Sequence, residues 1–131
     1  MKSCFLIFIF LMSNIIYSAD ECSLVKGAPS SSRGDIVFIH GAGSSPKTFY
    51  KVAKSFFSYF DLKFFLNNSG KNVSQALAST KAGELKVSEI SLSLWADDLK
   101  QFLEEHRIQK AHFITHSFGA RILAEYISIY S

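Results

Sequence analysis

The chain has 131 residues, which is enough for one domain at most. Its hydrophobic fraction of 48% and charged fraction of 19% are typical of a globular protein and argue against intrinsic disorder. A net charge of +3 is too small to indicate a nucleic-acid-binding surface, and two cysteines cannot supply a disulfide scaffold or a zinc site. We therefore expect a single folded domain with no metal, no other cofactor and no nucleic-acid partner.

The first 19 residues have the three parts of a secretory signal peptide. Lys2 supplies the basic start, an apolar run from Phe5 to Met12 forms the middle, and small residues up to Ala19 precede a polar break. The apolar run is shorter than the roughly 20 residues that a membrane-spanning helix needs. We therefore expect a leader that is removed, a secreted or periplasmic protein, and no stable membrane span. A buried N-terminal helix or an uncleaved anchor is the alternative.

Residues 20–34 are rich in turn-forming residues and predict a linker. The apolar run at residues 35–39 is typical of a strand that is buried on both faces of a parallel sheet. A tight loop with two glycines follows, and Pro46 suits the first turn of the next helix. That helix is predicted to pack one apolar face into the core, formed by Phe49, Val52, Ala53, Phe56, Phe57 and Phe60.

A second strand is predicted at residues 62–66, and the polar stretch after it shows only weak periodicity up to about residue 86. A strongly amphipathic helix then begins near Ser91. Asp97 and Asp98 are adjacent on this helix and so point in different directions. We interpret both as part of the solvated face rather than as a metal or paired-carboxylate site.

The third strand is predicted at residues 111–115, and a final helix follows it to residue 131. The expected apolar face of this helix consists of Ala120, Leu123, Ala124 and Ile127. Strands that alternate with helices predict an α/β protein, with a parallel sheet and flanking helices. With only three strands, we expect the third to lie at an edge of the sheet.

Ser117 lies between the end of the third predicted strand and the start of the final helix. A turn this sharp strains the backbone of the serine and lifts its hydroxyl clear of the sheet. The residues two positions before and two positions after Ser117 must be small, because the strand and the helix pass close together there. Gly119 meets this need. Thr115 is larger than the glycine that the pattern G-x-S-x-G has at its position. The segment predicts Ser117 as a nucleophile, with His116 and Gly119 as supporting residues of the turn.

The loop after the first predicted strand carries His40, Gly41, Ala42 and Gly43. Acyl transfer needs backbone N–H groups that point at the developing oxyanion. One can come from Phe118, the residue after the nucleophile, and the other from this loop, at Ala42. The two glycines let the backbone approach closely, with His40 as the first residue of the loop. These residues predict an oxyanion hole.

Residues 35–50 and 91–126 resemble the third-strand and fifth-strand regions of the α/β-hydrolase fold family. The resemblance extends to the helix and connector that lead into the nucleophile turn of its esterase- and lipase-like members. It implies a serine hydrolase for an ester, thioester or amide, with Ser117 as nucleophile and Ala42 and Phe118 as oxyanion donors. Its substrate would be a small-molecule or lipid ester. Residues 66–70 depart from the family pattern, so nothing transfers there.

The same resemblance implies a histidine base and an acidic partner after the nucleophile in chain order. Residues 121–131 contain Glu125 and no histidine. None of the four histidines is expected to act as the base, given how the base must contact the nucleophile; they are His40, His106, His112 and His116. We therefore expect residues 35–131 to form a partial hydrolase domain, truncated before the base and the acid. A catalytically dead hydrolase scaffold that acts as a binding or interaction module is the alternative.

Two N-glycosylation patterns begin at Asn67 and Asn72, and the sequence leaves their use open. An aspartate-nucleophile enzyme is disfavoured because the turn holds a serine. A dinucleotide-binding loop at residues 41–43 is disfavoured because Pro46 occupies the place of the third glycine. The sequence does not indicate which ester is the substrate, whether a lid exists, or the oligomeric state.

Overall fold

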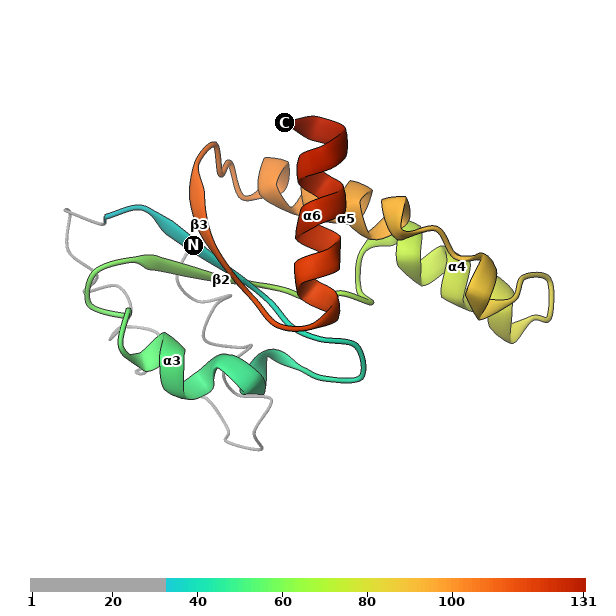
Figure 1. Ribbon diagram of the computed structural model, residues 1–131, viewed down its shortest axis with the longest axis horizontal. Coiled ribbons are helices and arrows are strands. Elements are labelled where there is room, and N and C mark those ends of the chain that lie inside the picture. The colour runs from blue at the N-terminus through green and yellow to red at the C-terminus, as the bar shows by residue number, and fades with distance from the viewer. Residues whose placement is uncertain (1–32) are drawn as a thin grey trace.

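The computed structural model of the chain describes residues 33–131. The expected leader at residues 1–19 and nearly all of the expected linker at residues 20–34 lie outside the described residues. Three short parallel strands form one sheet in the order β2-β1-β3 (Figure 1). The strands are β1 (Asp35–Ile39), β2 (Asp61–Phe65) and β3 (Ala111–Thr115). With its flanking helices, the described chain is a small α/β fold, as the sequence predicts.

The bounds of β1 and β3 agree with the prediction, and β2 begins at Asp61 rather than at residue 62. β1 lies in the centre and pairs with both neighbours along its whole length, so that Ile39 lies opposite Phe65 of β2 and Thr115 of β3. The apolar residues of β1 are buried because helices cover both faces of the sheet. In the part of the chain that the structure describes, β3 is an edge strand, as expected.

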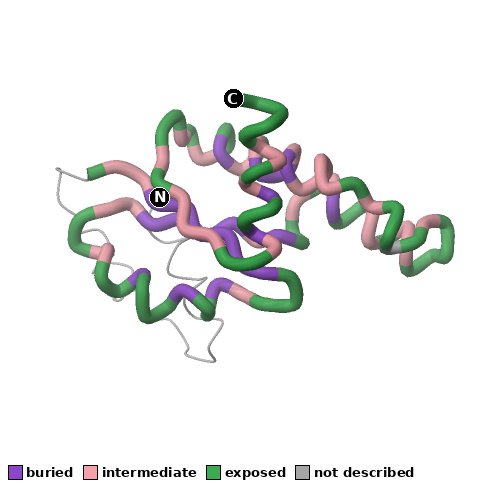
Figure 2. Tube along the Cα trace, in the orientation of Figure 1, coloured by how far each residue is buried: buried purple, intermediate pink, exposed green. Residues whose placement is uncertain are grey.

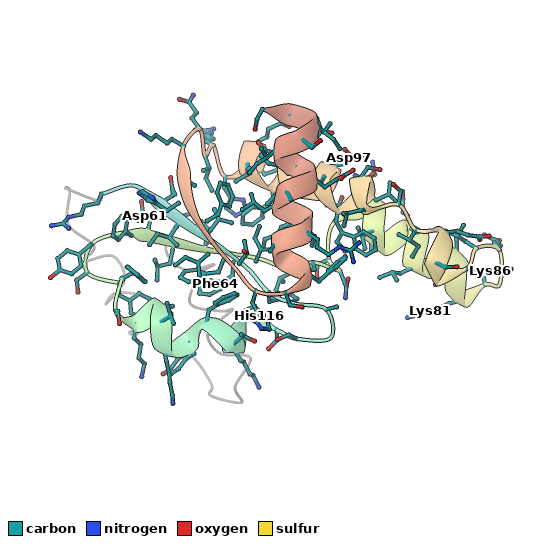
Figure 3. All side chains as sticks on the ribbon, in the orientation of Figure 1. Asp61, Phe64, Lys81, Lys86, Asp97 and His116 are labelled. Atoms are coloured by element: carbon teal, nitrogen blue, oxygen red, sulfur yellow. The ribbon has the colours of Figure 1, made fainter. Side chains whose placement is uncertain are left out.

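One face of the sheet is covered by the segment that follows β1, which forms the 3-10 helix η1 (Pro46–Phe49) and the helix α3 (Tyr50–Lys54). The Phe38 ring stacks on the Phe64 ring with 4.8 Å between centroids, and Phe64 lies between the sheet and α3 (Figure 3). The buried core on this face consists of Ile36, Phe38, Phe49, Ala53, Leu62 and Phe64.

The predicted helix face from Phe49 to Phe60 is wrong in two respects. The helix ends at Lys54, and the remaining aromatic residues pack against the core from turns. Val52 was expected on the buried face but is 46% exposed. The aromatic residues thus belong to the core as predicted, although most of them do not lie on a helix.

The opposite face is covered by α5 (Leu92–Glu105) and α6 (Phe118–Tyr130), which pack against each other and lie across the sheet from α3 (Figure 1). Ser91 caps α5, because its hydroxyl accepts a hydrogen bond from the N–H of Ser93. The buried core on this face consists of Val37, Ile39, Phe65, Leu99, Leu103 and Ile122.

The predicted apolar face of α6 is wrong in three of its four residues, since Leu123 packs against the core as expected. Ala120 and Ala124 are exposed and Ile127 is 50% exposed, whereas Ile122 and Gly119 are buried. The rotation of α6 follows from the close packing of Gly119 on the end of β1, described below. Figure 2 shows the C-terminal half of this helix as largely exposed.

The polar stretch after β2 forms a helix that the sequence did not indicate, α4 (Lys71–Lys81), which extends away from the sheet (Figure 1). A short 3-10 helix, η2 (Val87–Glu89), follows it. The prediction that Asp98 is solvated is also wrong, since this residue is only 2% exposed. Its carboxylate accepts hydrogen bonds from the first turn of α4, where backbone N–H groups otherwise have no partner.

Within residues 33–131, no helix combines the length and the apolar content that crossing a bilayer requires.

Candidate active site

Ser117 joins β3 to α6 with φ 52° and ψ −116°. A positive φ is strained for a residue with a Cβ, and Arg107 is the only other non-glycine residue between 33 and 131 that has one. The strain expected at the nucleophile turn is therefore present. Ser117 is exposed and lies at the N-terminus of a 13-residue helix, whose positive end favours negative charge on the serine oxygen.

Close packing between β1 and α6 positions this turn. The N–H of His116 donates to the carbonyl of Ile39 at 3.1 Å, so the turn starts where the pairing of β1 with β3 ends. A Cβ on Gly119 would lie 2.2 Å from the carbonyl oxygen of Ile39 and 2.8 Å from that of His40. Only glycine fits there, which explains the need for a small residue two positions after the serine.

The loop after β1 packs directly against the turn. A Cβ on Gly41 would lie 3.0 Å from His116 Nδ1 and 3.3 Å from Ser117 Cβ, so a side chain at this position would crowd the serine. Figure 3 shows His116 at the base of α6, next to this loop. Gly43 has φ 65°, a conformation that glycine adopts without strain. The structure thus brings Gly41 and Ser117 together, as the sequence predicts.

The backbone N–H groups of Ala42 and Phe118 donate no hydrogen bond to any atom of residues 33–131. The next two N–H groups of α6 are used, because Gly119 donates to His116 and Ala120 donates to Ser117. Ala42 and Phe118 are therefore free to bind an oxygen atom outside the described chain, as an oxyanion hole requires.

His40 is buried and is held by Asn67, a residue to which the sequence analysis gave no structural role. His40 Nδ1 lies 2.9 Å from the carbonyl oxygen of Gly41, and the N–H of Asn67 donates to His40 Nε2 at 3.4 Å. Asn67 Nδ2 also donates to the His40 carbonyl at 2.6 Å. Both ring nitrogens of His40 are therefore used to fix the loop, with the proton on Nδ1. His40 cannot act as the base for Ser117.

Asn67 could have been found from the topology alone. It follows the end of β2, and the carboxyl ends of adjacent parallel strands meet at one edge of the sheet, where binding sites form. Its burial also bears on glycosylation: Asn67 is 2% exposed, which leaves no room for a glycan in the folded protein. The Nδ2 of Asn72 donates to Asp98 at 2.9 Å and is likewise engaged.

His106 and His112 have structural surroundings, and His116 is exposed. His106 ends α5 with Nδ1 2.8 Å from the Phe102 carbonyl oxygen, and the His112 ring lies edge-on to Phe60 with 5.7 Å between centroids. In the described chain, Ser117 Oγ makes no hydrogen bond to any of them. The structure therefore combines a strained turn at Ser117 with a glycine loop packed against it, and among residues 33–131 no histidine forms a hydrogen bond with Ser117 Oγ.

Ala42 and Phe118 line a hollow of about 390 Å³, which we call the Trp95 hollow. The Trp95 ring packs edge-on against the Phe118 ring with 5.2 Å between centroids. The Arg121 guanidinium lies over the Phe118 ring, 5.9 Å from its centroid. The full lining is Ala42, Gly43, Asn67, Asn68, Ser88, Ile90, Leu92, Trp95, Phe118 and Arg121. A space of this size suits a small ligand, and it lies on the side of the expected oxyanion donors.

A second hollow, of about 370 Å³, lies between β2, the start of α4 and the end of α5. Phe65, Phe102 and His106 are among its lining residues, and none of the predicted site residues lines it. Across residues 33–131, no group of three or more histidine, cysteine or acidic side chains is arranged to hold a metal ion.

No family model matches the chain, and the comparisons with curated proteins and with solved structures find no match.

Proposed function

We propose that the chain is a serine hydrolase-like protein of the α/β-hydrolase type, in which Ser117 attacks the acyl carbonyl of an ester, thioester or amide. The observation that carries the proposal is the strained turn at Ser117, with φ 52°, packed against the glycine loop of the neighbouring strand. An ordinary loop serine would not need a positive φ. It would also not need a glycine two residues later, at a position where any Cβ would clash with β1.

The proposed chemistry follows from the two loops. Ser117 Oγ bonds to the carbonyl carbon, and the carbonyl electron pair moves onto oxygen. The N–H groups of Ala42 and Phe118 donate to this oxyanion, which also lies at the positive end of α6. When the intermediate collapses, the leaving group departs and the acyl group stays on Ser117, until water hydrolyses the acyl-serine ester.

The proton of Ser117 needs a base, and no histidine among residues 33–131 forms a hydrogen bond with Ser117 Oγ. We therefore propose that the chain carries the nucleophile half of such a site and does not turn over substrate by itself. A dead hydrolase scaffold that binds a ligand is the second candidate. The lack of a hydrogen-bonded base among residues 33–131 is equally consistent with this second candidate. The Trp95 hollow could hold a ligand whether or not Ser117 reacts.

Labelling with a fluorophosphonate probe distinguishes the two candidates. Ser117 displaces fluoride from the probe, and the phosphoryl oxygen occupies the oxyanion hole during the reaction. We expect a slow adduct on Ser117, located by mass spectrometry, which Ser117→Ala abolishes. Ser128 is an exposed serine on the same helix, so Ser128→Ala is the matched control and should label like the unmodified chain. A folded chain that acquires no adduct on Ser117 supports the dead scaffold instead.

A further inference from the structure

The segment that covers one face of the sheet carries charge of a single sign. Residues 33–131 contain 12 basic and 9 acidic side chains. Three of the basic ones, Lys47, Lys51 and Lys54, lie at residues 44–60, where there is no acidic side chain. The rest of the described chain is balanced, with nine side chains of each sign. The net positive charge of the described residues is therefore concentrated on η1 and α3.

These lysines lie together on the outward side of the segment. α3 follows η1 without a break, and Phe49 and Ala53 hold the inward side in the core. The lysines are spaced at i, i+4 and i+7, which places them on one side of a helical segment. All three are exposed, and α3 lies on the outside of the molecule, across the sheet from α5 and α6 (Figure 1).

Two exposed hydrophobic side chains flank the lysines. Tyr50 is 38% exposed and Val52 is 46% exposed. The Lys54 ammonium lies 4.3 Å from the centre of the Tyr50 ring, so the cation and the aromatic ring belong to one surface. We call the surface formed by Lys47, Tyr50, Lys51, Val52 and Lys54 the lysine face.

Cationic and hydrophobic groups on one exposed face are complementary to the surface of an anionic bilayer. Anionic headgroups attract lysine ammonium groups, and a lysine stem can pack on apolar groups while its ammonium stays in the polar layer. Tyrosine rings are favoured at the same depth. A nucleic acid would pair with the lysines through its phosphates but would not take Val52 out of water.

We propose that the lysine face binds the surface of a bilayer that contains anionic phospholipid. The lysines lie against the headgroup phosphates, and Tyr50 and Val52 enter the layer beneath them, without any segment crossing the bilayer. The proposal goes beyond the proposed function and does not depend on it, since binding requires no reaction at Ser117.

Sedimentation of the full chain with lipid vesicles tests the proposal. One set of vesicles is phosphatidylcholine alone, and the other is an equimolar mixture of phosphatidylcholine and phosphatidylglycerol. We expect binding to the mixed vesicles to be at least about tenfold tighter, and to weaken as the salt concentration rises. Replacing Lys47, Lys51 and Lys54 together by glutamine should weaken binding to the mixed vesicles at least about tenfold.

The matched control replaces Lys71, Lys81 and Lys86 together by glutamine. It removes the same charge from other exposed positions, and Figure 3 shows Lys81 and Lys86 far from α3. This variant should bind the mixed vesicles within about twofold of the unmodified chain. All variants share residues 1–32, so differences between them report on the substituted positions.

Val52→Ser separates a bilayer from other polyanions. It should weaken binding to the mixed vesicles about threefold, because less apolar surface is buried, and should leave retention on immobilised heparin unchanged. Ile129→Ser is the matched control, since Ile129 at the end of α6 is also 46% exposed. It should bind the vesicles like the unmodified chain.

Equal binding to the two kinds of vesicle, or equal losses in the two triple variants, would overturn the proposal. Vesicle binding that Val52→Ser leaves unchanged would also overturn it, because the lysine face would then attract any polyanion. If Val52→Ser does not fold, the two triple variants still decide. Ser117→Ala should bind the vesicles like the unmodified chain, whereas fluorophosphonate labelling bears only on the proposed function.

Discussion

The carboxylate of Asp98, near the middle of α5, accepts a hydrogen bond from the backbone N–H of Val73 at 2.9 Å. Asn72 adds two more bonds to the same carboxylate, from its N–H and from its Nδ2, each at 2.9 Å. A residue from one helix thus caps the start of another helix 25 residues away in the sequence. The approach is so close that a Cβ on Gly70 would lie 2.2 Å from this carboxylate.

Asp98→Ala should therefore lower the free energy of unfolding by about 2–3 kcal/mol, because it removes a buried charged acceptor and leaves two backbone N–H groups unpaired. Urea denaturation measures the loss. Asp97→Ala is the matched control at the adjacent position, where the carboxylate bonds only to the exposed Tyr130 hydroxyl near the end of α6. It should cost about 0.5 kcal/mol or less. Equal losses in the two variants would contradict the capping role.

Gly119→Ala should cost at least about 2 kcal/mol, because the new Cβ would overlap the carbonyl oxygen of Ile39 and push α6 away from β1. The same shift should slow fluorophosphonate labelling of Ser117. Gly83→Ala is the control: Gly83 has φ 78° and open space around it, so only backbone strain of about 1 kcal/mol is expected. Labelling as fast as in the unmodified chain would show that Gly119 does not position the serine.

Asn67→Ala removes the hydrogen bond to the His40 carbonyl and should destabilise the chain by about 1–3 kcal/mol. We also expect slower labelling of Ser117, since the loop after β1, the proposed source of an oxyanion donor, loses the side chain that holds it. Asn68 is the exposed neighbour, and Asn68→Ala should leave unfolding and labelling rates unchanged. If the two variants label at equal rates, Asn67 does not support the oxyanion loop.

The hydrogen bond to Asp97 is the main cause that raises the pKa of Tyr130 above its ordinary value of 10.0. Asp97→Asn removes the charge and should bring this pKa back toward the ordinary value, as followed by ultraviolet absorbance titration. A raised pKa means that the contact stabilises the fold fully below the ordinary pKa and is lost as the pH rises through the raised one. Glu84→Gln, at an exposed position, should leave the titration unchanged. Identical titrations of Asp97→Asn and the unmodified chain would contradict this cause.

The 131-residue chain should hydrolyse p-nitrophenyl esters no faster than the background. The physical reason is that no base among residues 33–131 is hydrogen-bonded to Ser117 Oγ and able to accept its proton. A spectrophotometric assay of the chain beside Ser117→Ala measures this. Clear hydrolysis that disappears in the variant would show that a base reaches the serine.

Local sequence signals were sufficient for the strands and for the turn at Ser117. Short apolar runs placed β1, β2 and β3 to within one residue at each end, and the position of Ser117 between a strand and a helix predicted its strained backbone. Ser91 marked the start of α5 because N-caps act through residues adjacent in sequence.

The features that the sequence missed depend on distant contacts. Residues 71–81 have a weak apolar pattern, and α4 begins where Asp98 from α5 caps it. Three of the four residues on the predicted face of α6 are exposed, because the rotation of this helix depends on the contact of Gly119 with Ile39, which periodicity cannot show. Asn67 was noted only as a glycosylation pattern, since its bonds to His40 span 27 residues.

The register of β3 against β1 has a consequence for the spacing of the site. Thr115 lies opposite Ile39, so the two chain segments that carry Ser117 and Ala42 leave the sheet at the same level. Because side chains alternate between faces, the smallest slip that keeps β3 facing the same way is two residues, or about 6.6 Å along the strand. Such a slip would separate Ser117 from Ala42, the proposed oxyanion donor in the loop after β1, by more than the length of a hydrogen bond. Adduct formation at Ser117 would therefore report whether the edge strand β3 is in the correct register with β1. A measurement of overall stability does not resolve this property of a single strand.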